Sequence, residues 1–327
     1  MIISKTPYRI SFFGGGTDFP SWYKEHGGAV ISTTIDKYCY ISLRELPPFF
    51  EHRYRIIYSI IECVKKVEEI KHPAVREILK NWNILKGLEI HHDGDLPARS
   101  GLGSSSSFVV GLLHCLHAFC EQIVSKEQLA IEAIEVERDL LKENVGSQDQ
   151  VAAAFGGFNL TFFYPDNSFR VEPLPLPKEK LKQLQQHLLL VFTGVSRFSS
   201  EIAEQQVQNT LQHKKEYFII REMVDESVKI LNSKRDITDF GKLLHESWLL
   251  KKSLSSKIST PVIDEIYEIA RKNGATGGKV LGAGGGGFML LFVPPEYQTN
   301  VKTKLERFLF VDFEFENNGS QIIFYQP

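Results

Sequence analysis

One stretch constrains this chain more than any other. In PARSGLGSSSSFVVGLLHCLHAFC, residues 97–120, a loop of glycines and serines runs directly into an apolar helix. Gly101 and Gly103 allow backbone dihedrals that other residues avoid, and Ser104–Ser107 then begin the helix. Capping needs only one serine, so four need another explanation. Free N–H groups and the helix dipole favour an anion there, and serine hydroxyls donate to phosphate or bind Mg²⁺. Residues 101–107 are therefore predicted to be a phosphate-binding loop.

A second glycine-bearing stretch, PYRISFFGGGTDFPSW, ends a short expected strand near the N-terminus. Gly14, Gly15 and Gly16 carry no Cβ atom, so a ligand can approach their backbone closely. Thr17 and Asp18 follow them directly. A tight turn in which Asp18 caps a helix is the alternative interpretation of the same residues.

The third stretch, KVLGAGGGGFMLLFV, contains G-x-G-x-x-G at Gly282, Gly284 and Gly287. A dinucleotide-binding fingerprint would continue into a helix, whereas a strand is expected here. The chain has no G-x-x-x-x-G-K-[ST] pattern, which excludes a Walker P-loop. Close approach to a ligand or to another loop would explain four consecutive glycines, and a bulged structural turn is the alternative.

Two carboxylates stand in places where acidic residues are costly. An apolar stripe runs along the expected helix 126–143, and Glu137 falls inside it. A carboxylate on such a stripe must be paired or bound to a metal, and a buried salt bridge is the structural alternative. Asp149 precedes the small, apolar run VAAAFGGF, which fits an acid at the mouth of a site better than a surface cap.

These features together fit phosphoryl transfer. That reaction needs a phosphate cradle, a Mg²⁺ ligand and a group that orients or deprotonates the acceptor hydroxyl. Ser104–Ser107 could serve the first two needs, Glu137 the second and Asp149 the third. Arg9, in PYRIS, is available as a cation near the acceptor.

Composition excludes several other classes of partner. The net charge of -2 gives no basic field, so nucleic acid is not an expected partner. Four cysteines in 327 residues suggest no disulfide framework, and a reducing cytoplasm is the expected location. The N-terminus lacks an apolar signal core and no apolar run approaches about 18 residues, so no membrane association is expected.

The order of strand and helix patterns predicts two α+β domains, residues 1–175 and 176–327, divided at the proline-rich VEPLPLPKEK. Strands are expected at 29–35, 38–45, 87–92, 156–163, 188–192, 288–294, 310–315 and 321–325, the first two paired with each other. Helices are expected at 60–85, 105–121, 126–143, 199–232, 237–252 and 261–273, and after Pro295.

At these residues the chain resembles the GHMP small-molecule kinases, the family of galactokinase, homoserine kinase, mevalonate kinase and phosphomevalonate kinase. PYRISFFGGGTD, PARSGLGSSSS and KVLGAGGGGF are similar to the three signature motifs of that family and occur in its order. Within the family, GGGTD, QDQVAAAFGGFN and TGVSRFSSEI resemble the bacterial branch that acts on D-glycero-D-manno-heptose 7-phosphate. One departure is Ala98-Arg99, where that branch usually has Pro-Gly.

The resemblance implies an N-terminal domain like ribosomal protein S5 domain 2, a ferredoxin-like C-terminal domain, and ATP and substrate in the cleft between them. It implies ATP-dependent phosphorylation of the anomeric C1 hydroxyl of the heptose 7-phosphate, giving the 1,7-bisphosphate for nucleotide-activated heptose and surface polysaccharide. Asp149 would act as base beside Arg9, and Ser105 with Glu137 would hold Mg²⁺. The residues implied at the ATP phosphates are Gly101, Leu102, Gly103, Ser104, Ser105, Ser106 and Ser107.

The resemblance also implies a set of residues at the substrate and the transferred phosphoryl group. They are Gly15, Gly16, Thr17, Asp18, Gln148, Gly285 and Gly286. A substrate that already carries phosphate needs a further cation, for which Arg197 is the candidate, with a solvent-exposed arginine as the alternative. Another hexose 1-kinase, acting on fucose or galactose, and a ligand sensor that has lost catalysis are the competing functions. A monomer and a homodimer are both compatible with the sequence.

Overall fold

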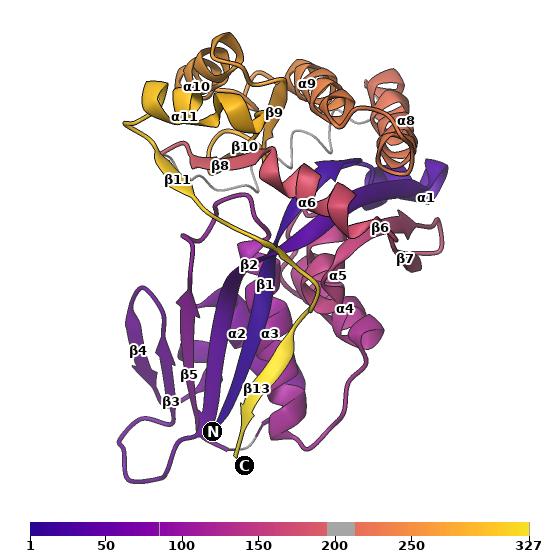
Figure 1. Cartoon of the computed structure of the whole chain (residues 1–327). Helices are drawn as coiled ribbons and strands as arrows, with labels where there is room; N and C mark the ends of the chain where they lie inside the picture. The colour runs from indigo at the N-terminus through magenta and orange to yellow at the C-terminus, as the bar shows by residue number, and fades with distance from the viewer. Residues whose placement is uncertain (85, 195–212, 327) are drawn as a thin grey trace.

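The computed structural model describes residues 1–84, 86–194 and 213–326, and two sheets organise this part of the chain (Figure 1). A nine-stranded sheet fills the lower part of the view, with helices α2 and α3 behind it. A four-stranded sheet lies above it, beneath α9, α10 and α11. The mixture of helices and largely antiparallel sheets confirms the expected α+β class.

Strand β2, Gly28–Glu45, runs through the nine-stranded sheet and pairs antiparallel with β1, Ile2–Phe13, along most of its length. The order is β13-β1-β2-β5-β3-β4, with β6 and β12 also on β2 and β7 on β6. β-branched and aromatic residues are frequent in both long strands, as expected for a pleated, half-buried surface. The remaining strands of this sheet are β3 (Tyr54–Ile57), β4 (Ile61–Val64), β5 (Leu88–Gly94), β6 (Phe158–Phe163), β7 (Phe169–Pro173), β12 (Phe315–Glu316) and β13 (Gln321–Tyr325).

The prediction that residues 29–35 and 38–45 pair with each other is wrong. Both belong to β2, and β1 pairs with the two halves in succession. The register shifts where Pro7 lies opposite Tyr38 and Tyr8 opposite Ile35, so the two intervening residues form a bulge. A bulge bends a strand without reversing it, and the intervening Asp-Lys pair carries no glycine of the kind that a hairpin turn requires.

The prediction of a mostly helical segment at 60–85 is also wrong in its first part. Strands β3 and β4 form a hairpin, and β3 pairs parallel with β5. A short 3₁₀ helix, η1 (Val67–Glu69), precedes α2, which begins only at Pro73 and ends at Trp82. Glu62, on β4, fixes the segment before α2, because its two carboxylate oxygens accept the N–H groups of Lys71 at 2.6 Å and His72 at 3.0 Å.

Local signals start several helices. Ser125 and Thr260 cap α4 and α10 by accepting the N–H groups of Gln128 at 3.1 Å and Ile263 at 3.4 Å. Proline occupies the start of four helices, where its missing N–H costs nothing. Among the described helices, none is long and apolar enough to cross a bilayer. The helices not yet bounded are α1 (Pro20–His26), α3 (Ser104–Phe119), α4 (Lys126–Glu135), the π-helical turn η2 (Val136–Leu140), α5 (Gln148–Phe155), α6 (Lys178–Gln186), α8 (Lys214–Leu231), α9 (Thr238–Ser253), α10 (Pro261–Lys272) and α11 (Pro295–Lys304).

The four-stranded sheet has the order β11-β8-β10-β9, with every pair antiparallel. Its strands are β8 (Leu188–Phe192), β9 (Gly277–Val280), β10 (Phe288–Phe292) and β11 (Leu309–Val311). The chain then returns to the first sheet, where β13 pairs with β1 (Figure 1). The sheet changes between β7 and β8, near the expected boundary at residue 175, but the last strands cross back, so the domain division stays a prediction.

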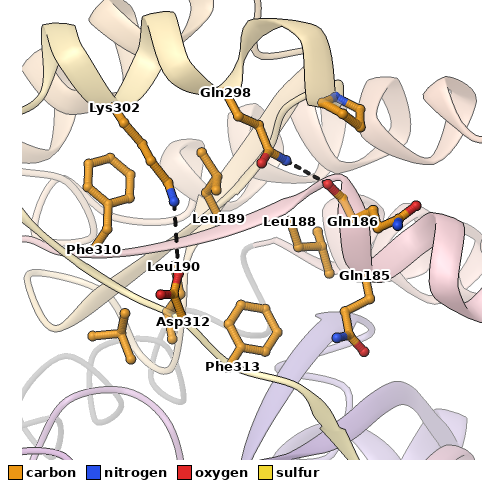
Figure 2. A pocket seen from close by; sticks show the side chains of 12 residues that line it. Gln185, Gln186, Leu188, Leu189, Leu190, Gln298, Lys302, Phe310, Asp312 and Phe313 are labelled. Carbon is orange, nitrogen blue, oxygen red and sulfur yellow. Dashed lines mark hydrogen bonds and ion pairs between the residues drawn. The ribbon is translucent and has the colours of Figure 1, made fainter.

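A cavity of about 380 Å³ lies between α6, β8, α11 and the segment after β11 (Figure 2). Gln298 Nε2 donates to Gln186 O at 2.6 Å, and Lys302 Nζ lies 3.9 Å from Asp312 Oδ1 across it. None of the predicted site residues within the described ranges lines this cavity. The candidate site must therefore be sought at the motifs themselves.

Candidate active site

Arg9 and Asp149 lie at the centre of the site. Arg9, on β1, donates from Nε and Nη2 to the two carboxylate oxygens of Asp149, on α5, at 2.7 Å each. Arg9 also reaches the predicted phosphate loop, because Nη1 donates to Gly101 O at 2.7 Å and its main-chain N–H to Leu102 O at 3.0 Å. Only 5% of the Arg9 side chain is exposed, against 25% for Asp149. The two-pronged ion pair thus fixes the carboxylate beside the loop and leaves part of it accessible to a ligand.

Glu137 is fully buried in the π-helical turn η2, where α4 was expected to continue as an ordinary helix. Its Oε2 accepts hydrogen bonds from Ser106 Oγ at 2.7 Å and from Gln150 Nε2, whereas its Oε1 has no partner in the described chain. Burial raises the pKa of Glu137 to about 8. The serine that meets this acid is Ser106 and not Ser105, which faces solvent, because successive helical side chains point about 100° apart.

The flanking serines of the loop have structural partners. Ser104 Oγ accepts the N–H of Arg99 at 3.1 Å, which closes the loop at the start of α3. Ser107 is buried and donates to Pro7 O at 2.9 Å, which ties α3 to β1. The backbone of Arg99 is left-handed, with φ of 59°. Of the middle two serines, Ser106 directs its hydroxyl at Glu137 and Ser105 is exposed to solvent.

The glycines of the loop at 101–103 and of the third stretch are explained largely by each other. A Cβ atom on Gly101 would lie 2.5 Å from Leu281 O, and one on Gly282 would lie 2.7 Å from Gly101 Cα. A Cβ atom on Gly287 would lie 2.2 Å from Ser100 O. Such distances are too short for any side chain, so close approach of two loops accounts for these glycines. The third stretch therefore forms one wall of the phosphate loop.

In the stretch PYRISFFGGGTDFPSW, the three glycines divide into two kinds. Gly14 and Gly16 have φ of 87° and 102°, and a Cβ atom on them would lie 2.0 and 2.9 Å from a neighbouring atom. Packing therefore requires both. Gly15 is different, since its nearest neighbours would be Gln148 Nε2 at 3.5 Å and Ser11 Oγ at 3.6 Å. Gly15 thus faces the side chain that begins α5, next to Asp149.

Thr17 and Asp18 lie beneath this turn. Thr17 is buried, and its hydroxyl bonds two main-chain oxygens at 2.7 and 2.9 Å. Asp18 is fully buried and accepts the N–H groups of Gly16 at 2.8 Å and Gln148 at 3.2 Å. Burial raises the pKa of Asp18, and the negative charge of Asp149 adds to the rise. Asp18 holds the glycine turn against α5 and Thr17 holds it against β2, and their contact with substrate stays a prediction.

Unpartnered polar atoms mark the same segments. Buried polar atoms without a hydrogen-bond partner are rare in folded proteins, and each one calls for an explanation such as water, an ion or a ligand. Those in the described segments that build this site are the side-chain oxygens of Ser11, Ser100, Glu137, Gln148 and Gln150. Two of them, on Gln148 and Gln150, belong to the residues on either side of Asp149 in α5. A ligand bound near Asp149 could therefore supply their missing hydrogen bonds.

Of the remaining predicted residues, Gly285 and Gly286 are buried in the turn before β10, and Gly285 donates to Ile258 O at 2.9 Å. Arg197 lies outside the described residues, so its predicted role is not addressed by the structure.

Two lysines that the sequence analysis did not single out lie in the same region. Lys279, on β9, is buried and donates from Nζ to Phe12 O at 2.8 Å. Lys251, on α9, donates from Nζ to Val280 O at 3.3 Å and to Gly282 O. The sequence signals were present: Lys279 opens the third glycine stretch, and Lys251 lies in the largely apolar run SWLLKK.

This arrangement can bind an anion at the start of α3 and position an acceptor hydroxyl at Asp149. The N-terminal end of α3 supplies main-chain N–H groups, and the third stretch closes the other side. Asp149 supplies a carboxylate, and Glu137 supplies a second one beneath the serines. A phosphate cradle beside two acids with different surroundings is what phosphoryl transfer to a hydroxyl requires.

Comparison with known proteins agrees with this geometry. The family of GHMP kinases N terminal domains matches residues 62–157, and the family of GHMP kinases C terminal domains matches residues 227–311. The chain is 31% identical to a D-glycero-alpha-D-manno-heptose 7-phosphate kinase of Campylobacter jejuni, over 97% of each chain. It is 25% identical to a bifunctional fucokinase/GDP-fucose pyrophosphorylase of Arabidopsis thaliana, over 95% of this chain and 32% of that longer protein.

The fold is shared with solved structures as well. The crystal structure of a D-glycero-D-manno-heptose 1-phosphate kinase from Bacteriodes thetaiotaomicron superposes with a TM-score of 0.74 at 24% identity, and 100% of each chain is covered. The two family models cover the serine loop and the third glycine stretch, and the 31% identical relative is itself named as a kinase. The chain belongs to the GHMP kinase family, and it is an enzyme of the phosphotransferase class with an alcohol group as acceptor.

Proposed function

We propose that this protein is an ATP-dependent sugar kinase that phosphorylates the anomeric C1 hydroxyl of D-glycero-D-manno-heptose 7-phosphate, giving the 1,7-bisphosphate. The product would serve nucleotide-activated heptose and surface polysaccharide synthesis. The single observation that carries the chemistry is Asp149, held by Arg9 at the edge of the loop 101–107. Support for the acceptor comes from the relative named as a heptose 7-phosphate kinase.

Asp149 accepts the proton of the acceptor hydroxyl in this mechanism. Arg9 holds the carboxylate by two hydrogen bonds, so its position relative to the loop is fixed before substrate arrives. Main-chain N–H groups at the start of α3 bind the phosphate oxygens of ATP. The acceptor oxygen then bonds to the terminal phosphorus, the bond to the ADP oxygen breaks, and the proton remains on Asp149.

The residues around Glu137 fit a bound Mg²⁺. Mg²⁺ prefers oxygen ligands and keeps several water or phosphate ligands, so one carboxylate and one hydroxyl suffice from the protein. Glu137 has an oxygen without a partner, and Ser106 beside it and Ser105 on the solvent side supply hydroxyls. Within the described chain, no group of three or more His, Cys, Asp and Glu residues is placed to hold a metal ion. Bound there, Mg²⁺ would neutralise charge on the phosphates.

The acceptor would bind on the open side of Asp149. Gly15 and Gln148 face each other there, and Gln148 has a side-chain oxygen without a partner, suited to a sugar hydroxyl. Gly285 and Gly286 would border the transferred group. Thr17 and Asp18 act from beneath by holding the glycine turn.

A second acceptor class deserves a test because the Arabidopsis relative, which aligns with 95% of this chain, is named a fucokinase. The experiment measures ADP formation with a panel of free sugars, including fucose and galactose, and sugar phosphates, including heptose 7-phosphate. Phosphorus NMR of the product then locates the new phosphate. Turnover with heptose 7-phosphate and a new anomeric phosphate support the proposal, whereas turnover confined to free hexoses assigns the protein to the alternative.

A further inference from the structure

Two lysines in the site have no anionic partner among the described residues. Lys279 is 5% exposed and Lys251 is partly buried, and their Nζ atoms donate only to main-chain carbonyl oxygens. Neither forms an ion pair with a described aspartate or glutamate. The neighbour of Lys251 on α9 behaves differently, since Lys252 Nζ lies 2.6 Å from Asp264 Oδ1. Buried cations are costly unless an anion accompanies them, so the pair calls for a counter-charge.

The contacts of Lys251 lead directly to the phosphate loop. Its Nζ binds the carbonyl oxygen of Gly282, and Gly282 packs on the backbone of Gly101. Gly101 O in turn accepts from Arg9, which holds Asp149. The ammonium group therefore lies on the side of the loop that the third glycine stretch forms. Figure 1 shows the helix that carries it, α9, beside β9 above the first sheet.

The charges of the site support an anion at this place. Burial lowers the pKa of Lys251 to about 8, and repulsion from Arg9 adds to the effect while Asp18 opposes it. Burial also lowers the pKa of Lys279 well below its usual value, with repulsion from Lys251 and Arg9 adding to it. Three cations thus repel one another in this region, and Asp18 is the acid that opposes the effect at both lysines. A phosphoryl group would relieve that repulsion.

We propose that Lys251 is a further catalytic residue whose ammonium group contacts the phosphoryl group during its transfer from ATP. Two of its three N–H bonds are directed at Val280 O and Gly282 O, which leaves the third for a phosphate oxygen. Lys279 acts behind it as a positioning residue, because its bond to Phe12 O fixes β9 against β1. This inference rests on the kinase function proposed above.

The step keeps its atoms and charges in balance. The acceptor oxygen forms the new bond to phosphorus, the bond to the ADP oxygen breaks, and the acceptor proton goes to Asp149. Lys251 stays protonated throughout and donates to an oxygen of the transferred group. Removing one such preorganised donor typically costs roughly 10²-fold or more in turnover.

A clamp that merely holds the turn after β9 is the competing explanation, and nucleotide binding separates the two. Calorimetry with Lys251→Met compares the affinity for ADP with that for a non-hydrolysable ATP analogue. A contact to the transferred group predicts an affinity for ADP close to that of the unmodified protein and roughly tenfold weaker binding of the analogue. A clamp predicts that both affinities fall together, along with the melting temperature, and that outcome overturns the inference. Lys252→Met removes one charge from the same helix and is the matched control.

The pH profile gives a second readout that folding defects cannot imitate. Turnover of the unmodified protein should fall as pH rises through about 8, because Lys251 loses its proton there. Lys251→Arg keeps its charge at high pH and should lose this alkaline limb, even if its maximal rate is lower. An unchanged limb in Lys251→Arg contradicts the inference. If Lys251→Met transfers phosphate as well as the unmodified protein does, the catalytic role of Lys251 is excluded and the kinase function stands. If the unmodified protein binds no nucleotide, the proposed function fails as well.

Discussion

Asp149 and Glu137 are both acids of one site, and their surroundings differ in nearly every respect. Asp149 is partly exposed and both of its oxygens are held by Arg9. Glu137 is fully buried, is held by neutral donors and keeps one oxygen without a partner in the described chain. A carboxylate that arginine holds in place and that solvent can reach is suited to take the proton of a substrate hydroxyl. A buried carboxylate with an unpartnered oxygen is suited to bind a cation. The difference predicts separate roles that substitution can test.

The largest effect is expected at the exposed acid. Asp149→Asn keeps the size of the side chain but cannot take the acceptor proton, so turnover should fall by roughly 10²–10⁴-fold. Binding of ATP, measured by calorimetry, should persist because the loop amides are intact. Asp139→Asn, at an exposed acid paired with Arg138, is the control. An Asp149→Asn enzyme with nearly full turnover would remove the base from the mechanism.

The buried acid should show its effect through the metal. Glu137→Gln retains an oxygen that accepts from Ser106 and Gln150 but carries no charge, so the Mg²⁺ concentration for half-maximal turnover should rise roughly tenfold or more. Titration of activity with Mg²⁺ measures this. Glu135→Gln, on the exposed side of the same helical segment, should leave the titration unchanged. Equal titrations for Glu137→Gln and Glu135→Gln would contradict a metal role.

A smaller effect distinguishes two neighbouring serines. Ser106→Ala removes the hydroxyl bonded to Glu137, so the Mg²⁺ requirement should rise by a factor of a few. Ser107→Ala removes only the bond to Pro7 O and should lower the free energy of unfolding by about 1 kcal/mol with no change in the Mg²⁺ requirement. Mg²⁺ titration and urea unfolding of both variants check the contrast. A shifted Mg²⁺ requirement in Ser107→Ala alone would reverse the assignment.

The smallest effect is on stability without nucleotide or metal. The pKa of Glu137 is raised from 4.5 to about 8, so between these values the folded chain holds a proton that the unfolded chain has lost. The free energy of unfolding should therefore fall as pH rises through that window. Glu137→Gln lacks this loss. Its free energy of unfolding, measured with urea, should therefore exceed that of the unmodified protein by an amount that grows with pH, to on the order of 1 kcal/mol after relaxation of the site. A constant difference between the two proteins would show that Glu137 is already ionised.

The contrast between the two acids also shows how far local sequence signals reach. Glu137 was recognisable because a carboxylate on an apolar stripe is costly, and the loop 101–107 because glycines and serines precede an apolar helix. Lys251 was not recognisable in this way. A single lysine at the end of a helix is usually solvated, and only the packing of α9 on β9 brings it to Gly282.

The same limit applies to the fold. Strands β8 and β10 of the second sheet follow from short apolar runs, whereas β9, with the sequence GGKV, was not predicted. Proline marks where several helices begin. Residues 60–64 were misassigned because they form β4, which pairs with β3, and β3 is in turn held by β5, some 30 residues further along the chain. Helical propensity in that region is outweighed by hydrogen bonds to a distant strand.

The sequence by itself determined that a loop of glycines and serines opens an apolar helix and that two acids follow it, because glycine dihedrals, helix ends and misplaced charges act over a few residues. The tertiary structure alone decided which serine donates to Glu137 and that the third glycine stretch packs on Gly101. It also decided that Lys251 binds Gly282 O and Lys279 binds Phe12 O. These outcomes depend on atoms brought together from opposite ends of the chain. Close packing and the burial of charge fix them, and neither is visible in a short window of sequence.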